Sequence, residues 1–228
     1  MSVNETRFQM TDSTSIPYII QNLKAVYGTP KPEQGLDPLD VLIETILSQS
    51  TTNANSKRAF ESLKHRFPTW ESARRARVSS IEAAIKSGGL AKQKSVRIKE
   101  LLNDINNRRG SLDLAFLRTA PLEEARAFLA GFKGVGPKTV ACTLLFAFNR
   151  PVFPIDTHIF RIARRLGLIP ERCSDEEAHR LMAEMIPEQR YYEVHINLIR
   201  LGRQICQPRD PLCERCCLVD YCEYYAAR

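Results

Sequence analysis

Apolar residues recur every three to four positions over most of the chain, which is the spacing of a helix with one buried face. The clearest runs span residues 19–27, 39–47, 59–67, 96–105 and 122–129. Prolines flank several runs, and Gly110 and Gly131 each follow one, where a helix commonly ends in a residue with positive φ. No stretch alternates convincingly with a period of two. The pattern therefore predicts an all-α protein with short connections.

Helical patterning resumes after Pro151 and then stops before the end of the chain. We expect a helix from Asp156 to Leu168, another from Ser174, and a third from about Tyr191 to Leu201. The remaining residues are predicted to form a loop-like tail that is rich in cysteine.

Charge is divided unevenly along the 228 residues, whose formal net charge is +7. Residues 1–150 hold 22 Lys and Arg against 14 Asp and Glu, whereas residues 151–228 hold 11 Arg against 12 acidic residues. Concentrated positive charge favours a polyanionic partner, because each neutralised phosphate releases counterions. On charge alone, a solvated surface that promotes solubility is an equal alternative.

Composition narrows the class of protein further. With 43% hydrophobic and 26% charged residues, the chain is neither collagen-like nor wholly disordered. Its longest nearly apolar stretch, residues 139–148, is half of the roughly 20 residues that a membrane span needs. We therefore expect no membrane anchor and no export, and an intracellular, cytoplasmic location.

The segment from Leu129 to Val140 predicts a hairpin between two helices. Gly134 and Gly136 permit a tight turn, and Pro137 can open the next helix because that position has no donor to lose. Such a turn leaves backbone N–H groups outside, where they and the helix dipole can bind a phosphate. A plain turn is the alternative, and the position in the basic part of the chain favours phosphate binding.

Asp156 stands where the next predicted helix begins, after Pro151 and Pro154. A carboxylate at this position is an N-cap, which stabilises a helix by about 1 kcal/mol. The positive end of the helix dipole also holds the carboxylate in a fixed orientation, so capping and a catalytic role are compatible.

Five of the seven cysteines lie within the last 23 residues, which indicates a metal site because no secretory signal is expected. Four follow an x6, x2, x5 spacing: Cys206, Cys213, Cys216 and Cys222. Four thiolates hold either zinc or an iron–sulfur cluster, and the wide arms around a single x2 spacing favour the bulkier cluster. Cys217 adjoins a ligand position and is predicted to point elsewhere.

These three motifs, in this order on a basic helical chain, resemble the endonuclease III family of helix-hairpin-helix DNA glycosylases. The resemblance runs from about Pro17 to Tyr224 and implies two helical lobes. Residues 40–150 would form a six-helix barrel that ends in the hairpin. Residues 151–228, packed with an N-terminal segment (1–39), would form a lobe whose four cysteines bind a [4Fe–4S] cluster.

The family's functional residues transfer by motif. Its hairpin Leu-Pro-Gly-Val-Gly-Arg-Lys-Thr matches residues 132–139 and assigns the catalytic lysine to Lys138. Its Val-Asp-Thr-His-Ile-Phe-Arg matches residues 155–161 and assigns the catalytic aspartate to Asp156. The resemblance further implies DNA contacts by the hairpin and the following helix start: Lys133, Gly134, Val135, Gly136 and His158.

Two further motifs match less fully. Residues 49–52 match Gln-Ala-Thr-Asp, so that Gln49 would fill the space left by a flipped nucleotide. Residues 89–91 match Gly-Leu-Tyr, which makes Leu90 a candidate wedge. The alternatives are that Gln49 caps a helix end and that Leu90 belongs to the core. Three departures leave the lesion preference open: Thr52 replaces an acid, Ala91 an aromatic residue and Pro137 an arginine.

The resemblance implies a bifunctional enzyme of base excision repair that acts on double-stranded DNA. It would flip and excise oxidised pyrimidines or act at abasic sites, with a Schiff base on Lys138 and cleavage by β-elimination. We expect a monomer, located in the cytoplasm or at the nucleoid. Two alternatives are a monofunctional glycosylase for mismatched bases, uracil or adenine, and a non-catalytic helix-hairpin-helix module with structural zinc.

Overall fold

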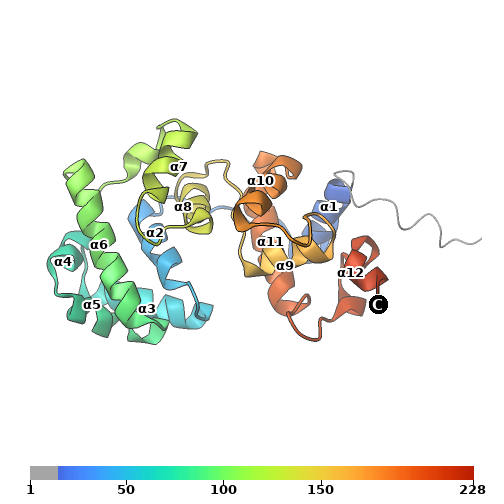
Figure 1. Ribbon diagram of the computed structural model, residues 1–228, viewed down its shortest axis with the longest axis horizontal. Helices are drawn as coiled ribbons and strands as arrows, with labels where there is room; N and C mark the ends of the chain where they lie inside the picture. The colour runs from blue at the N-terminus through green and yellow to red at the C-terminus, as the bar shows by residue number, and fades with distance from the viewer. Residues whose placement is uncertain (1–14) are drawn as a thin grey trace, which may run out of the picture. The chain divides into compact units, whose positions relative to one another are not determined.

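The computed structural model describes residues 15–228, which are helical with no strand among them. The expectation of an all-α fold is confirmed. The described chain forms two compact units (Figure 1). The continuous unit comprises residues 33–150, and the split unit comprises residues 15–32 together with residues 151–228.

The continuous unit is built from seven α-helices and two short 3-10 helices. They are α2 (Pro38–Leu47), α3 (Asn53–Arg66), α4 (Trp70–Arg75), α5 (Val78–Ala84), η2 (Lys86–Gly88), α6 (Ala91–Arg109), η3 (Ala115–Arg118), α7 (Leu122–Ala130) and α8 (Pro137–Phe148). α2 packs along α8 and against α3, and α5 packs on α6. Ile43, Ile46 and Leu144 are fully buried in this core, each contributing about 1.5–3 kcal/mol.

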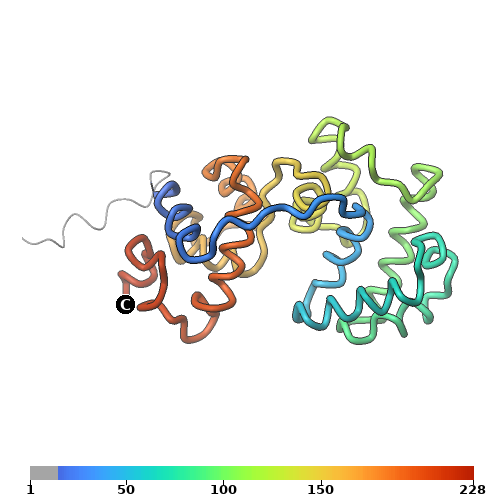
Figure 2. The backbone as a smooth tube through the Cα atoms, turned by 180° about the vertical axis from the view of Figure 1, so that it is seen from behind, coloured from blue at the N-terminus to red at the C-terminus, as the bar shows by residue number. Residues whose placement is uncertain are grey.

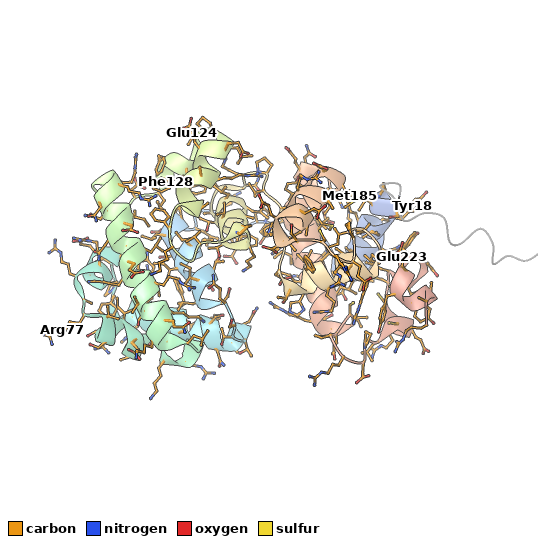
Figure 3. The ribbon with its side chains drawn as sticks, in the orientation of Figure 1. Tyr18, Arg77, Glu124, Phe128, Met185 and Glu223 are labelled. Atoms are coloured by element: carbon orange, nitrogen blue, oxygen red, sulfur yellow. The ribbon has the colours of Figure 1, made fainter. Side chains whose placement is uncertain are left out.

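Local signals account for several helix ends in this unit. Asp37 caps α2, because its Oδ1 accepts from the N–H groups of Leu39 at 2.8 Å and Asp40 at 3.3 Å. α6 ends at Gly110, whose φ of 73° allows its N–H to bond the carbonyl of Asn106. At the end of α7, Phe128, labelled in Figure 3, makes edge-to-face contacts with Phe116 and Phe132.

Gly131 corrects one expectation. It does follow α7, but its φ is −71° and not positive. The helix turns directly into the hairpin, and the N–H of Gly131 bonds the carbonyls of Ala127 and Leu129 without a left-handed residue. A Cβ here would lie 2.9 Å from the end of the Arg108 side chain, so that flexible side chain would have to shift.

The split unit joins the first described helix to the C-terminal third of the chain (Figure 2). Its α-helices are α1 (Ile16–Tyr27), α9 (Thr157–Arg165), α10 (Asp175–Met185), α11 (Tyr191–Gln204) and α12 (Glu223–Ala226), with short 3-10 helices η4 (Glu188–Arg190), η5 (Cys213–Arg215) and η6 (Val219–Tyr221). α11 packs against both α1 and α9. Asn197 and Arg200 in α11 donate to the carbonyls of Gly28 and Tyr27 at 3.0 and 2.9 Å.

Candidate functional site

The hairpin between α7 and α8 has an exposed tip and two buried apolar side chains that fix it to the protein. Lys133, Gly134 and Gly136 are exposed, whereas Phe132 and Val135 are buried. Gly134 has a φ of 81°, a conformation that favours glycine. Within residues 15–228, the N–H groups of Gly134 and Gly136 donate to no other backbone group. With the first turn of α8 beside them, these donors are available to a phosphate.

Gly136 is a second correction. Its backbone is extended, with φ −89° and ψ 178°, and a Cβ built on it meets nothing within 4 Å. The protein's own backbone therefore does not require glycine at this position. A requirement could come only from a bound molecule that approaches the backbone closely.

Lys138 is the second residue of α8 and is partly exposed, and its neighbour Thr139 is buried. The Thr139 hydroxyl accepts a hydrogen bond from Gln49 Nε2 at 3.4 Å. Gln49 follows the end of α2, and its Oε1 accepts from an Arg97 guanidinium N–H at 2.9 Å. The Gln49 side chain thus bonds to α6 and α8 and caps no end of α2, which rules out the simple capping alternative.

Leu90 precedes α6 and is 52% exposed, with a φ of 49°. The alternative that Leu90 is a core residue is therefore wrong. A Cβ on Gly89 would lie 3.7 Å from the carbonyl oxygen of Ser50, so the loops that carry Gln49 and Leu90 lie side by side. Thr52 caps α3 by accepting from the N–H of Asn55 at 3.3 Å.

A buried lysine bonds to the backbone of both segments that lead into these loops. Lys94 is 2% exposed, and its Nζ donates to the carbonyls of Leu47 at 2.7 Å and Gly88 at 2.9 Å. Burial lowers the pKa of Lys94, and the positive charge of Arg97 lowers it further. The end of α2 and the segment before Leu90 are therefore fixed by one side chain of α6.

Asp156 and His158 form a second group, in the split unit. Asp156 caps α9, because its Oδ1 accepts from the N–H groups of His158 at 2.9 Å and Ile159 at 2.8 Å. The predicted N-cap is confirmed. The preceding loop is fixed by two imidazoles, since His179 Nε2 accepts from the N–H of Ile155 and His195 Nδ1 meets the carbonyl of Pro154.

Arg161 links this helix start to the cysteine segment, a contact that sequence reasoning missed although Arg161 belongs to the matched motif. Its guanidinium donates to the carbonyl oxygens of Cys206 and Gly202 and lies 3.1 Å from His158 Nδ1. His158 also packs so closely on Gly202 that a Cβ there would lie 2.7 Å from the His158 Cβ. α9 and the first cysteine are therefore held together.

Four cysteines and Arg165 line one pocket in the split unit, and Cys217 does not line it. The sulfur-bearing residues are Cys206, Cys213, Cys216 and Cys222. Arg165 donates to the Cys206 Sγ at 3.3 Å. Within residues 15–228, no three His, Cys, Asp or Glu side chains are close enough to hold a metal ion.

Burial dominates the titration of these thiols. The pKa of Cys216 is raised to about 12, and burial is the largest cause. The hydrogen bond from the N–H of Leu218 lowers this pKa, whereas the charges of Cys217, Cys206 and Cys222 raise it. Burial likewise raises the pKa of Cys222. Thiolates that line one pocket repel one another, so their deprotonated forms would be favoured only when a cation is bound among them.

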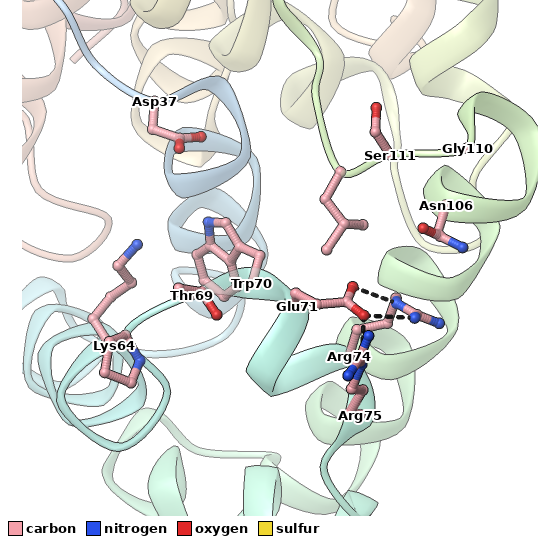
Figure 4. Close-up of a pocket in the computed structure, with 12 residues that line it drawn as sticks. Asp37, Lys64, Thr69, Trp70, Glu71, Arg74, Arg75, Asn106, Gly110 and Ser111 are labelled. Atoms are coloured by element: carbon pink, nitrogen blue, oxygen red, sulfur yellow. Dashed lines mark hydrogen bonds and ion pairs between the residues drawn. The ribbon is translucent and has the colours of Figure 1, made fainter.

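A separate polar pocket of about 660 Å³ lies elsewhere in the continuous unit (Figure 4). Trp70 and Lys64 line it, and Glu71 is paired there with Arg74 and Arg75. These pairs hold the pKa of Glu71 at about 2, the hydrogen bond from Arg74 being the largest cause. None of the predicted site residues lies in this pocket.

None of the helices within residues 15–228 is long and apolar enough to cross a membrane.

Comparison with known proteins identifies the family. A model described as the HhH-GPD superfamily of base excision DNA repair proteins matches residues 43–188. Endonuclease III of Thermotoga maritima is 31% identical over 199 residues, which cover 87% of this chain and 89% of that protein. The chain therefore belongs to the HhH-GPD superfamily, and the resemblance to endonuclease III is confirmed.

Other relatives are longer than this chain. A protein of Arabidopsis thaliana described as a DNA glycosylase is 44% identical over 185 residues, or 81% of this chain and 62% of the relative. DNA glycosylase/AP lyase ROS1 of the same plant is 32% identical, over 69% of this chain and 13% of its own length. The chain thus spans under two thirds of these two relatives.

The fold is shared with solved structures. An endonuclease III trapped as a covalent intermediate with DNA matches with a TM-score of 0.82 and 24% identity, over 95% of this chain and 98% of that one. A thermostable thymine-DNA glycosylase matches with a TM-score of 0.80 and 23% identity, over 94% and 98%. At this identity the likeness concerns the fold.

Proposed function

We propose that this protein is a DNA glycosylase with AP lyase activity that acts in base excision repair. One observation carries the proposal. Lys138, the proposed nucleophile, adjoins Thr139, whose hydroxyl accepts a hydrogen bond from Gln49, the residue proposed to fill the duplex. A reacting amine and a side chain that enters the DNA must lie close together if one enzyme uses both on the same nucleotide.

The relatives support this proposal through their names. ROS1 is named as a DNA glycosylase/AP lyase, and the trapped endonuclease III complex is a covalent protein–DNA intermediate. A covalent adduct requires a nucleophile on the protein. Lys138 occupies the motif position of the family's catalytic lysine, and its primary amine can form an imine with the sugar.

Extrusion of the damaged nucleotide comes first, at a cost of a few kcal/mol that is lowest for a poorly stacked base. Exposed Leu90 and partly exposed Gln49, on adjacent loops, would occupy the vacated space. The hairpin would bind the phosphate backbone through the N–H groups around Gly134 and Gly136 without reading base sequence.

Chemistry at the sugar would follow. The neutral Lys138 amine attacks C1′, and the base leaves with a proton to give an aminal. The C1′–O4′ bond then breaks, O4′ takes a proton as the sugar ring opens, and the nitrogen lone pair forms the C1′=N bond of a protonated imine. Removal of a C2′ proton then expels the 3′ phosphate by β-elimination. Asp156, oriented by the N–H groups at the start of α9, would stabilise positive charge at C1′ and assist proton transfer.

We further propose that the four pocket cysteines hold a [4Fe–4S] cluster. The pocket that the four cysteines share, and their x6, x2, x5 spacing, support this proposal, and the guanidinium of Arg165 beside Cys206 would offset the negative charge of the ligating thiolates. When bound, the cluster would supply iron–thiolate bonds that fix the segment from Cys206 to Cys222.

Borohydride trapping tests the proposed function. Wild-type protein incubated with abasic duplex and borohydride should form a covalent adduct, and Lys138→Gln should form none while still binding DNA. Lys133→Gln, which removes a charge from the same hairpin, is the matched control and should still be trapped. An adduct on the Lys138→Gln protein would reassign the nucleophile.

For substrate, we propose oxidised pyrimidines, which have lost aromaticity and stack poorly. Single-turnover excision of thymine glycol and dihydrouracil should exceed that of uracil opposite guanine or adenine opposite 8-oxoguanine. Thr52 and Ala91 border the loops of Gln49 and Leu90, and they replace an acid and an aromatic residue of the family pattern. We therefore expect base excision to be slower than abasic-site cleavage, or limited to fewer damaged bases. Preference for either mismatch over both oxidised bases would contradict this assignment.

A further inference from the structure

We propose that Arg97 is a positioning residue that holds the Gln49 amide in one orientation beside the hairpin carrying Lys138. The inference rests on the proposed function, because it assigns Gln49 to the vacated duplex. Neither the charge pattern nor a motif of the sequence singles out Arg97. Its role follows from three contacts within the continuous unit.

The first two contacts make Gln49 a bridge between helices. An Arg97 guanidinium N–H donates to Gln49 Oε1 at 2.9 Å, and Gln49 Nε2 donates to the Thr139 hydroxyl at 3.4 Å. Thr139 is 2% exposed and lies one residue after Lys138. The position of the amide is therefore tied on one side to α6 and on the other to the first turn of α8.

Arginine also determines which way the amide faces. A guanidinium has donors and no acceptor, so the carbonyl oxygen of Gln49 must point toward Arg97. The amide nitrogen then faces Thr139, and its second N–H is the group that Gln49 can present to DNA. Without Arg97, the amide could rotate by a half turn and accept a hydrogen bond from Thr139 instead.

The third contact joins Arg97 to the hairpin tip. A Cβ on Gly134 would overlap the side chain of Arg97, with the guanidinium carbon only 2.7 Å away. Gly134 thus provides both the positive φ of the turn and the space through which Arg97 passes. A single side chain contacts the phosphate-binding turn and the residue proposed to enter the duplex.

A rival role for Arg97 is a direct contact to a DNA phosphate. No carboxylate among the described residues forms an ion pair with it, so its charge is available to DNA. A phosphate contact would weaken binding to all duplexes and reduce the salt dependence of binding by about one charge. A positioning role acts through Gln49 and need not change the salt dependence.

A double-mutant cycle separates these roles. Arg97→Met, Gln49→Ala and the double variant are compared for single-turnover cleavage of abasic and thymine glycol duplexes, and for binding at several salt concentrations. Lys92→Met, which removes an exposed charge from the same helix, is the control and should leave the cleavage rate unchanged. We expect Arg97→Met to slow cleavage about tenfold in the wild-type background and to have no further effect in Gln49→Ala.

Additive losses, or a reduced salt dependence with an unchanged rate, would overturn the inference in favour of a phosphate contact. Arg97→Lys keeps the charge but offers a point donor on a flexible stem. It should keep the wild-type salt dependence and still cleave as slowly as Arg97→Met. Arg97→Lys also preserves the comparison if Arg97→Met proves unstable in thermal unfolding.

A measurement without catalysis distinguishes failure of this inference from failure of the proposed function. In ¹⁵N-labelled protein, the side-chain NH₂ resonances of Gln49 are assigned from their loss in Gln49→Ala. They should report a rigid amide in wild type and a mobile one in Arg97→Met. Equal mobility in both proteins would refute the positioning role, whereas absence of all excision with a rigid amide would refute only the proposed function.

Discussion

The continuous unit and the split unit differ in net charge and in how far apart along the chain their contacting residues lie. By sequence, residues 33–150 hold 19 Lys and Arg against 12 acids, whereas residues 1–32 and 151–228 together hold 14 of each. The basic excess therefore belongs to the unit that carries the hairpin, Gln49 and Leu90. We infer that the continuous unit supplies most of the phosphate affinity.

The split unit instead concentrates contacts between distant parts of the chain. Asn197 and Arg200 bond to residues 169 and 173 positions away, and Tyr18 stacks on Tyr221 with ring centroids 6.1 Å apart. Its cysteine segment has only short helices, η5, η6 and α12. The stability of the split unit therefore depends on contacts between distant parts of the chain and, under our proposal, on a cofactor. The stability of the continuous unit depends on helix packing.

The largest expected effect concerns this dependence. Cys216→Ser should release the iron and unfold residues 206–228 while the continuous unit stays folded, because metal binding and folding of such a segment are coupled. Iron and sulfide analysis and hydrogen exchange would measure both effects. Cys217→Ser is the matched control, since Cys217 does not line the pocket, and it should keep the iron. A wild-type protein loaded with zinc and lacking iron would contradict the cluster.

Asp156→Asn should slow single-turnover excision by roughly 100-fold or more, on the scale of lost electrostatic or acid–base help. Asparagine caps helices about as well as aspartate, so the melting temperature should hardly change. Asp156→Ala removes the cap as well and should lower both rate and stability. If Asp156→Asn excised at the wild-type rate, the carboxylate would serve only as a cap of α9.

Gly134→Val should weaken binding to damaged and undamaged duplex alike, by about tenfold, because the valine side chain opposes the positive φ and overlaps Arg97. Gly136→Ala is the sharper probe, since the protein itself has room for that Cβ. Loss of affinity in Gly136→Ala would report a close approach of DNA. Unchanged affinity in both variants would make the hairpin a plain turn.

The smallest effect is expected for Asn197→Ala in the split unit. The change removes a part-buried hydrogen bond to the Gly28 carbonyl and should lower the free energy of unfolding by about 1 kcal/mol. Thermal unfolding would measure it. Asn107→Ala, at an exposed position of α6, is the control and should cause no loss. A loss in Asn197→Ala no larger than that in the control would show that this hydrogen bond between α11 and Gly28 contributes little to stability.

Most helix positions could be predicted from the sequence because apolar spacing and N-caps are local. Asp37, Asp156 and Ser174 each cap the expected helix. Backbone angles at glycines were less predictable. Of the glycines at the hairpin, only Gly134 has a positive φ. The N–H of Gly131 bonds carbonyls of α7 while its φ stays negative, and the backbone of Gly136 is extended.

The candidate site was predicted residue by residue but not as an assembly. The motifs identified Gln49, Leu90 and Lys138, yet nothing local indicated that Arg97 would hold Gln49. Nor did the sequence indicate that buried Lys94 would donate to the carbonyls of Leu47 and Gly88. Such contacts arise between helices far apart in the chain, so only the folded structure reveals them.

The division of the chain also has a consequence for biosynthesis. During synthesis, α1 leaves the ribosome before the other described helices. Its partner helix α11, which carries Asn197 and Arg200, leaves much later. The continuous unit, whose residues are all made in between, can fold while α1 still lacks its partners. We therefore expect nascent chains in which residue 150 has left the ribosome but α11 has not to protect α2 to α8 from protease while α1 is still cleaved.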